Sequence, residues 1–255
     1  MFNKDRWQEI FETIKKNKLR TFLSGFTVAL GIFIFIILFG FGNGLKNSFK
    51  EFFLDDATNI LYIESGKTSK PFKGYKASRR IEFETEDLFD IQKFFSFYLE
   101  YITPRITRGA KIKFKNEYGN YTTRAVAPSH QFAEKTIVFS GRYLNDTDIK
   151  QKKKVAVIGR LVARDLFGEE DPIGKFVDIG KTVFKVVGVF KDSGGDNEER
   201  FVYIPYTTRQ KMEKATKKIG SIIVAFKPEI GNSGALAFEK QLREYLKQKK
   251  FIAPS

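Results

Sequence analysis

The feature that most constrains this chain is a long uncharged segment near its N-terminus. No charged residue lies between Arg20 and Lys46, and the 25 residues from Thr21 to Leu45 centre on an apolar run, Val28 to Phe39. As a helix the segment is roughly 37 Å long, enough to cross a hydrocarbon core of about 30 Å. Buried helices of soluble proteins seldom stay uncharged for so long, so the segment predicts a membrane-spanning helix. A cleaved signal peptide, with Gly40-Phe-Gly42 as its small-residue site, is the alternative, although its apolar region is usually only about 7–15 residues long.

The flanks of the segment predict its orientation. Residues 1–20 contain six basic and three acidic side chains, whereas residues 46–56 contain two lysines and three acidic residues. An excess of Lys and Arg keeps a flank in the cytoplasm. We therefore expect a cytoplasmic leader (1–20), a transmembrane helix (21–45) in the cytoplasmic (inner) membrane, and an extracytoplasmic domain (46–255).

Two sets of residues are candidates for contact with the membrane or a partner. One face of a helical leader, at the spacing i, i+3, i+4 and i+7, is formed by Trp7, Ile10, Phe11 and Ile14. Such an amphipathic helix can lie in the membrane surface or dock another protein, and a plain surface helix has the same pattern. Gly40 and Gly44 form a GxxxG pair, which permits close approach of another membrane helix.

The composition excludes several kinds of reactive site. The chain has no cysteine and a single histidine, His130, so thiolate nucleophiles, cysteine-held metals and sites with two histidines are excluded. The chain also lacks a Walker A sequence, a G-x-S-x-G elbow and an H-E-x-x-H motif. We expect no enzymatic activity, a surface position for His130, and solvated carboxylates in the turns Glu169–Asp171 and Glu198–Glu199.

The net charge of +15 raises the alternative of a basic nucleic-acid-binding protein. Consecutive lysines occur at 152–154, and a second cluster is Lys247, Lys249 and Lys250. The expected topology places both clusters outside the cytoplasm, away from nucleic acid. An anionic membrane surface or an acidic partner is the alternative for them.

Residues 46–255 alternate between strand and helix patterns, which predicts a mixed α+β fold. Expected strands lie at 59–64, 101–104, 111–115, 121–127, 154–159, 176–179, 183–190, 201–206 and 221–226, with a hairpin turn at 116–120. Helices are expected after Thr85, over 160–167, and near the end through Ala235, Phe238 and Leu242.

Several short blocks in the second half resemble MacB-like ABC transporter permeases. They are Ser140 to Asp148, Val155 to Gly159, Leu166 to Gly168, Asp171 to Lys175, Phe184 to Val189 and Val202 to Pro205, and Asn17 to Ser24 resembles the start of the first membrane helix of that family. The blocks contain the following motif residues, for which we expect structural roles: Gly141, Arg142, Asp148, Gly159, Leu166, Phe167, Gly168, Pro172, Gly174, Gly188 and Pro205.

The resemblance implies a non-catalytic permease subunit that couples ATP hydrolysis by a cytoplasmic ABC-type ATPase to motion outside the membrane, for export or mechanical transmission. It implies no cofactor in this chain, with ATP on the partner, and a homodimer or paralogous heterodimer with a possible extracytoplasmic adaptor. It also implies a two-lobed domain, with one lobe (about 141–191) inserted into the other (46–140 plus 192–255).

Such permeases have four membrane helices, whereas this sequence has one apolar run. We therefore expect a fragment of a longer permease. The alternative is a single-pass anchored binding or adaptor protein without a transport role. The substrate is not indicated by any pattern in the sequence.

Overall fold

The computed structural model describes Trp7 and residues 14–55, 59–192 and 197–253, of which 45–55 and 232 are described as backbone only. These residues form two units, one reaching to Leu54 and the larger one from Asp55 to Ser255. Each is described by itself.

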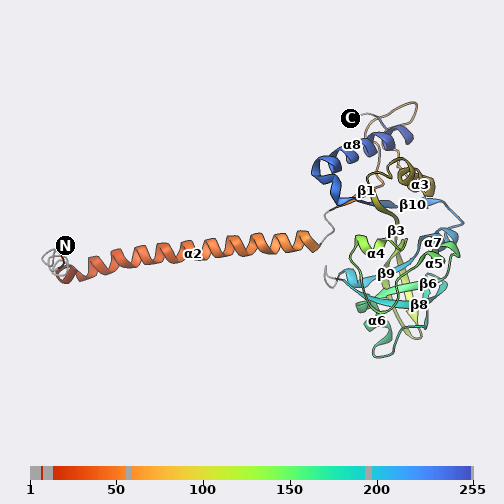
Figure 1. Cartoon of the computed structure of the whole chain (residues 1–255). Coiled ribbons are helices and arrows are strands. Elements are labelled where there is room, and N and C mark those ends of the chain that lie inside the picture. Colours follow the sequence, from red (N-terminus) through yellow and green to blue (C-terminus); the bar gives the residue numbers. More distant parts are fainter. Residues whose placement is uncertain (1–6, 8–13, 56–58, 193–196, 254–255) are drawn as a thin grey trace. The chain divides into compact units, whose positions relative to one another are not determined.

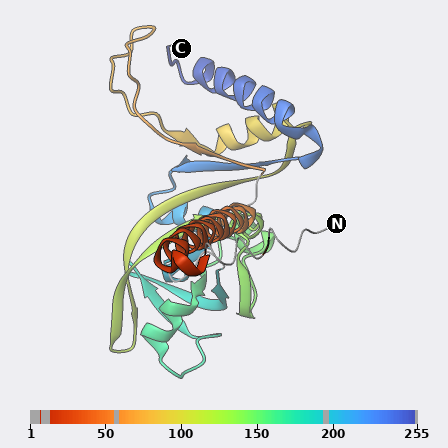
Figure 2. The same ribbon diagram turned by 90° about the vertical axis from the view of Figure 1, so that its left-hand side faces the viewer.

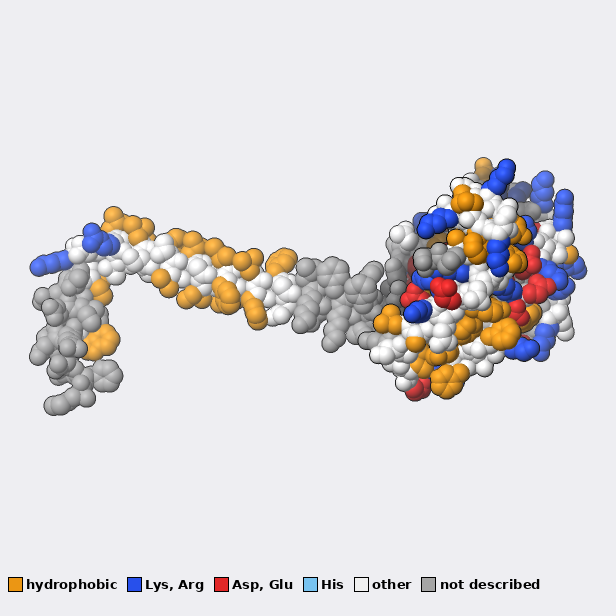
Figure 3. Space-filling model, turned by 90° about the horizontal axis from the view of Figure 1, so that it is seen from above, with side chains coloured by type: hydrophobic (Ala, Val, Ile, Leu, Met, Phe, Trp, Pro, Cys, Tyr) orange, Lys and Arg blue, Asp and Glu red, His pale blue; other side chains and the backbone are white. Residues whose placement is uncertain are grey.

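The first unit is a long helix, α2 (Lys18–Asp55, 38 residues). It contains no proline, and its side chains from Lys18 to Gly44 are all exposed. Figure 3 shows hydrophobic side chains along α2, with Lys and Arg at its N-terminal end. Within it, Lys18–Gly44 is long and apolar enough to cross a membrane, and none of the tested window is buried. A helix that is apolar all round and uncovered by protein suits a lipid environment.

The larger unit is built on one hydrogen-bonded sheet with the strand order β1-β11-β3-β4-β9-β6-β8-β5, and β7 pairs with both β3 and β8. Its strands are β1 (Ile60–Glu64), β3 (Leu99–Phe114), β4 (Glu117–Val126), β5 (Ile137–Gly141), β6 (Val155–Gly159), β7 (Phe176–Ile179), β8 (Thr182–Lys191), β9 (Phe201–Pro205) and β11 (Ser221–Phe226). A separate pair is β2 (Phe83–Glu84) with β10 (Lys218–Ile219). Pairing is mixed, because β4–β9 and β6–β8 are parallel and the rest antiparallel.

Helices cover this sheet at both ends. They are α3 (Thr85–Phe94), α4 (His130–Ala133), α5 (Asp146–Lys150), α6 (Arg160–Phe167), α7 (Tyr206–Met212) and α8 (Gly231–Lys249), with short 3-10 turns η1 (Glu198–Arg200) and η2 (Pro228–Ile230). α3 and α8 lie side by side near β1, where Phe95 and Phe238 meet edge to face at 5.7 Å. α6 packs further along the sheet, with Phe167 stacked on Phe114 at 4.1 Å.

β3 is a single strand of 16 residues, where two separate strands were expected at 101–104 and 111–115. Figure 2 shows it as a long bent ribbon that runs from the end of the sheet carrying α3 and α8 to the opposite hairpin. Because Arg105 to Phe114 pair in unbroken register with Val126 to Glu117, the turn falls at Lys115 and Asn116. The expected turn at 116–120 was therefore wrong; Lys115 adopts the left-handed conformation (φ 51°) that closes the tighter hairpin.

Two apolar clusters lie on opposite faces of the sheet. The main core includes the fully buried Ile91, Ile112, Phe184 and Phe238. A smaller cluster on the other face contains Val126, Tyr143, Leu144, Val155, Val157, Phe190 and Tyr203. The predicted α+β class, with an apolar N-terminal helix ahead of a mixed domain, is confirmed.

The expected lobe boundaries stay a prediction. Within 141–191, β6 pairs with β9 and β7 pairs with β3, so the segment shares its sheet with strands on either side of it in the sequence. The hydrogen bonding of the sheet therefore continues across the expected lobe boundaries at positions 141 and 191.

Candidate functional site

The candidate contact residues of the first unit lie on exposed helix surface. A Cβ atom added at Gly40 or Gly44 would meet no atom within 4 Å, so the GxxxG face is open to another helix. Trp7 and Ile14 are exposed by 51% and 38%. Ile10 and Phe11 lie outside the described residues, and the contacts expected of all six residues stay predictions.

Three motif residues meet at the end of the antiparallel pairing between β5 and β8. Gly141 has a positive φ of 74°, and a Cβ there would lie 2.3 Å from the Val187 carbonyl oxygen. A Cβ at Gly188 would lie 2.1 Å from the Arg142 carbonyl oxygen, while the Arg142 amide donates to Val187 O at 2.9 Å. The two backbones therefore approach so closely that only glycine fits at both positions.

Arg142 and Asp148 form an ion pair directly after β5. The guanidinium donates two hydrogen bonds to the carboxylate, at 2.6 and 3.2 Å, and a third to its neighbour Tyr143 O at 2.9 Å. Asp148 is fully buried, and it forms a reciprocal capping box with Asn145 at the start of α5. This bidentate pair fixes the chain direction after β5.

Gly159, the last residue of β6, is the site of a second close contact between backbone segments. A Cβ there would lie 2.0 Å from the Glu199 carbonyl oxygen. The next residue, Arg160, donates to the Glu199 carboxylate at 2.7 Å. The expectation of a solvated Glu199 was wrong, because η1 folds onto the start of α6 and buries this side chain to 4% exposure.

The other motif residues also support the scaffold. Leu166 and Phe167 are buried in the main core, and Gly168 ends α6 with φ 58°. Pro172 O accepts a hydrogen bond from the amide of Lys175, and Gly174 N donates to Val186 O at 2.8 Å. Pro205 ends β9 and precedes α7. The motif residues thus hold backbone crossings and turns and do not converge on a reactive centre.

His130 lies in a buried polar cluster, which corrects its expected surface position. The side chain is 0% exposed, with Nδ1 3.3 Å from the Tyr143 hydroxyl and its ring packed on Tyr203. Burial, together with the positive charges of Arg124 and Arg105, lowers the pKa of His130 well below its ordinary value. The turn residues Pro128 and Ser129 are typical of a protein surface, and no pattern in the sequence indicates the polar cluster that buries His130 next to them.

Glu134 joins two arginines in this cluster. Its carboxylate accepts hydrogen bonds from Arg105 at 3.1 Å and from Arg124 at 3.0 Å. Arg105 also pairs with Glu64 of β1 at 2.9 Å, and Arg124 lies over the ring of Phe201 at 3.9 Å. The cluster therefore ties β1, β3, β4 and α4 together through charged hydrogen bonds.

Glu198 has the most altered carboxyl group near this cluster. Burial, a hydrogen bond shared with Asp192 and the negative charge of Asp192 raise the pKa of Glu198 to about 7. Glu134 adds to the rise and Arg124 opposes it. This carboxyl group therefore changes its charge near neutral pH.

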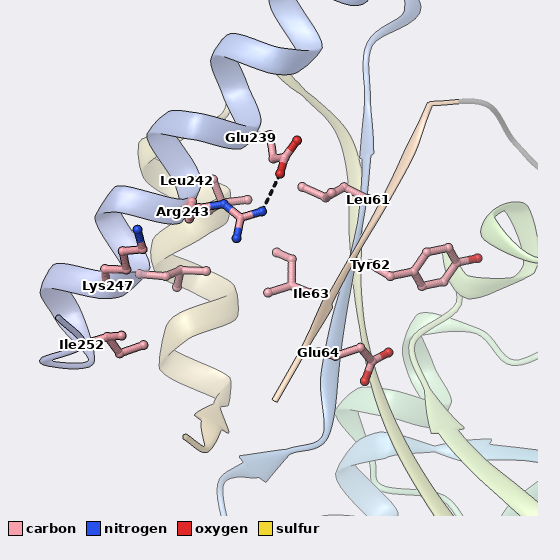
Figure 4. A pocket seen from close by; sticks show the side chains of 10 residues that line it. Leu61, Tyr62, Ile63, Glu64, Glu239, Leu242, Arg243, Lys247 and Ile252 are labelled. Carbon is pink, nitrogen blue, oxygen red and sulfur yellow. Dashed lines mark hydrogen bonds and ion pairs between the residues drawn. The ribbon is translucent and has the colours of Figure 1, made fainter. Parts of the chain in front are cut away.

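A groove of about 350 Å³ lies between β1 and α8. Figure 4 shows Leu61 and Ile63 pointing from β1 toward α8, with Tyr62 pointing away. Leu242, Leu246 and Ile252 complete its apolar wall. On its rim, Arg243 pairs with Glu239 at 2.6 Å and Lys247 with Glu244 at 3.1 Å. The floor and walls of the groove are apolar, and the charged side chains on its rim already form ion pairs with one another.

The described residues include no group of three His, Asp or Glu side chains placed to hold a metal ion. The second lysine cluster is also committed to packing, because Lys249 and Lys250 of the α8 end pair with Asp87 of α3 at 2.8 and 2.5 Å. Contact of this cluster with a membrane surface or an acidic partner stays a prediction.

Comparison with known proteins places this geometry in one family. The family described as "MacB-like periplasmic core domain" matches residues 21–237. The macrolide export ATP-binding/permease protein MacB of Bdellovibrio bacteriovorus is 27% identical over 202 residues, which is 78% of this chain and 31% of that protein. MacB of Chlorobium phaeobacteroides is 27% identical over 245 residues, which is 95% of this chain and 36% of that protein.

Solved structures agree with the fold. The periplasmic region of MacB from Actinobacillus actinomycetemcomitans superposes with a TM-score of 0.65 at 25% identity, covering 78% of this chain and 88% of that one. The extracellular domain of the noncanonic ABC-type transporter YknZ gives a TM-score of 0.63 at 19% identity, covering 76% and 96%. The chain spans about a third of the length of the curated relatives it matches.

Proposed function

This chain belongs to the family of MacB-like periplasmic core domains, and we propose that it acts as the N-terminal part of a non-catalytic ABC transporter permease subunit. The observation that carries the proposal is the extent of the family match. It runs from residue 21 to residue 237, and so includes the apolar helix and most of the larger unit in one continuous match. The exposed apolar surface of α2 supports insertion in the inner membrane.

The direction of work in the proposed subunit is from the cytoplasm outward. The basic leader would stay in the cytoplasm, and the larger unit would lie outside. A partner ATPase would bind ATP and move the leader and α2, and the larger unit would transmit that motion to a substrate or adaptor. In support, the relatives named above are ATP-binding/permease proteins, and this chain matches only about a third of their length.

Contacts for this coupling are assigned to exposed residues. Trp7 and Ile14 would meet the ATPase or the membrane surface, and Gly40 and Gly44 would meet a neighbouring membrane helix of a homodimer or paralogous heterodimer. The tightly packed motif residues would instead keep the larger unit rigid, because a unit that transmits motion must keep its shape when force acts on it.

Co-purification tests the proposal. The full-length protein, solubilised in mild detergent, should retain an ABC-type ATPase encoded beside its gene. A variant with Gly40→Leu and Gly44→Leu should lose dimerisation in crosslinking, whereas the control Gly42→Leu should keep it. Failure of the full-length protein to bind any such ATPase would refute the permease role and favour an anchored adaptor.

A further inference from the structure

One face of the sheet is left open at the hairpin end of the larger unit. Residues that pair in register lie on the same face, as do residues two apart along a strand. Register places the following residues together on this face, across β4, β3, β7 and β8: Tyr118, Asn120, Lys111, Lys113, Phe176, Asp178, Val183 and Lys185. We call them the open sheet face; every one of them is exposed.

The opposite side of the same strands is core. Ile112, Val177, Ile179 and Phe184 alternate with the residues of the open sheet face, and all four are buried. The open sheet face therefore consists of side chains on paired strands that are supported by the core beneath them.

Apolar side chains stand out from this surface. Tyr118 is exposed by 64%, Phe176 by 62% and Val183 by 50%. Aromatic side chains exposed in this way are typical of protein interfaces, where they contribute contact area at a small entropic cost.

The charge of the open sheet face is not neutralised. Three lysines, Lys111, Lys113 and Lys185, stand against the one carboxylate, Asp178, and no described carboxylate forms an ion pair with any of the three. The neighbouring Lys115 and Lys175, in contrast, both pair with Glu170, at 2.6 and 2.8 Å. The lysines at the α8 end are paired as well, so a surplus of positive charge remains here.

A hollow on the same face has donors for an anionic group. It has a volume of about 340 Å³ and is lined by Gly109, Lys111, Asn120 and Thr122 among others. Gly109 contributes no side chain, while the ammonium, amide and hydroxyl groups of the others can donate hydrogen bonds. Lys111 lines the hollow, and its ammonium also lies over the ring of the neighbouring Tyr118, 3.8 Å from the centroid.

We propose that the open sheet face is a docking surface for an acidic partner protein, with one carboxylate of the partner seated in the hollow beside Lys111. Charge complementarity selects the acidic character, and the exposed Tyr118 and Phe176 add the aromatic contact area that is typical of protein interfaces. A membrane surface attracts continuous polybasic segments, whereas here Asp178 lies among the lysines. Docking at this face requires neither a membrane helix nor an ATPase, so it is independent of the proposed coupling.

The test uses the full chain in nanodiscs of zwitterionic lipid. The probe is a soluble peptide rich in glutamate and leucine, and its partner probe has glutamine for every glutamate. We expect binding of the glutamate peptide alone. The triple variant Lys111→Glu, Lys113→Glu, Lys185→Glu should weaken binding roughly tenfold or more, because each reversal replaces an attraction with a repulsion.

The matched control is Lys67→Glu, Lys70→Glu, Lys76→Glu, which makes the same change of net charge on exposed loop residues and should shift the affinity by less than about twofold. Equal weakening in both variants would overturn the proposal, because attraction would then follow total charge. Phe176→Ser should also weaken binding, whereas Phe89→Ser on α3 should not. Binding of anionic vesicles through the three lysines, without binding of the peptide, would assign the face to lipid and refute the docking of a protein.

Discussion

The ionisation of Glu198 is coupled to the stability of the larger unit. Its folded pKa of about 7 lies above the ordinary value of 4.5. The folded state therefore keeps a proton that the unfolded chain releases, and folding is favoured by low pH at this site. The stabilisation is fully present below pH 4.5 and is lost as pH rises to about 7.

We predict that Glu198→Gln reduces the loss of thermal stability between pH 4.5 and about 7, because the variant has no proton to release at this position. Melting temperatures measured across this range check the prediction. The control is Glu169→Gln, an exposed turn residue that should leave the pH profile as it is. Parallel profiles for the wild type and Glu198→Gln would contradict the prediction.

His130 acts with the opposite sign. The pKa of His130 lies well below its ordinary value of 6.5 because the imidazole is buried. Below pH 6.5 the unfolded chain therefore binds a proton at this residue, whereas the folded chain does not. Stability from this residue is present above pH 6.5 and falls as the pH is lowered further. These two residues therefore contribute opposing slopes to the wild-type profile, and the difference between variants separates their contributions.

His130 and Glu199 show what a sequence can and cannot predict at the residue scale. The sequence contained one histidine and two adjacent glutamates in polar surroundings, and both sites were expected to be solvated. Burial of His130 and Glu199 depends on α4 and η1 folding onto the sheet, through contacts with residues distant in the chain. Local polarity predicts exposure only where no such element returns over the site.

At the scale of elements, the pairing of β5 with β8 is one of the closest backbone contacts of the larger unit. Gly188 approaches the Arg142 carbonyl so closely that an added methyl group would lie 2.1 Å from the oxygen. The sequence predicted a structural role for Gly141, Arg142 and Gly188 from the family resemblance. The sequence did not indicate the physical reason for that role, which is the close approach of two backbone segments at Gly141 and Gly188.

We predict that Gly188→Ala destabilises the protein by about 2–4 kcal/mol, because backbone atoms must separate and the neighbouring Arg142–Asp148 pair must shift with them. Chemical unfolding measures the loss. Gly66→Ala is the control, since a Cβ there meets nothing within 4 Å, and it should change stability by no more than about 0.5 kcal/mol. Similar losses in both variants would show that the close approach is relaxed in solution.

The sequence predicted helices and strands with a clear hydrophobic periodicity well, and it predicted the turns and strand continuations between them poorly. The strands 59–64, 176–179 and 221–226 and the helix 160–167 match β1, β7, β11 and α6 within a residue or two. The sequence predicts two strands where β3 is continuous, because Arg105 to Gly109 do not alternate between apolar and polar residues. One continuous ladder with β4 overrides that local ambiguity.

At the scale of the whole molecule, the proposed orientation depends on few charges. Six basic residues precede α2's uncharged run, and Lys15, Lys16 and Lys18 are three of them. Residues 1–255 include no cysteine, so a single cysteine introduced among them is the one maleimide site in this part of the protein. Asn17→Cys lies in the leader and keeps all six charges, while Lys70→Cys lies in an exposed loop of the larger unit.

We predict that a membrane-impermeant maleimide labels Lys70→Cys in spheroplasts, and labels Asn17→Cys only after the membrane is permeabilised. Labelling after permeabilisation shows that each cysteine is accessible, so a missing signal before that step reports its side of the membrane. Replacing Lys15, Lys16 and Lys18 with glutamine should then make part of the Asn17→Cys population accessible from outside, because the basic excess that retains the leader is removed. If Asn17→Cys is labelled in spheroplasts with all its charges present, the larger unit faces the cytoplasm, and a role outside the membrane is ruled out.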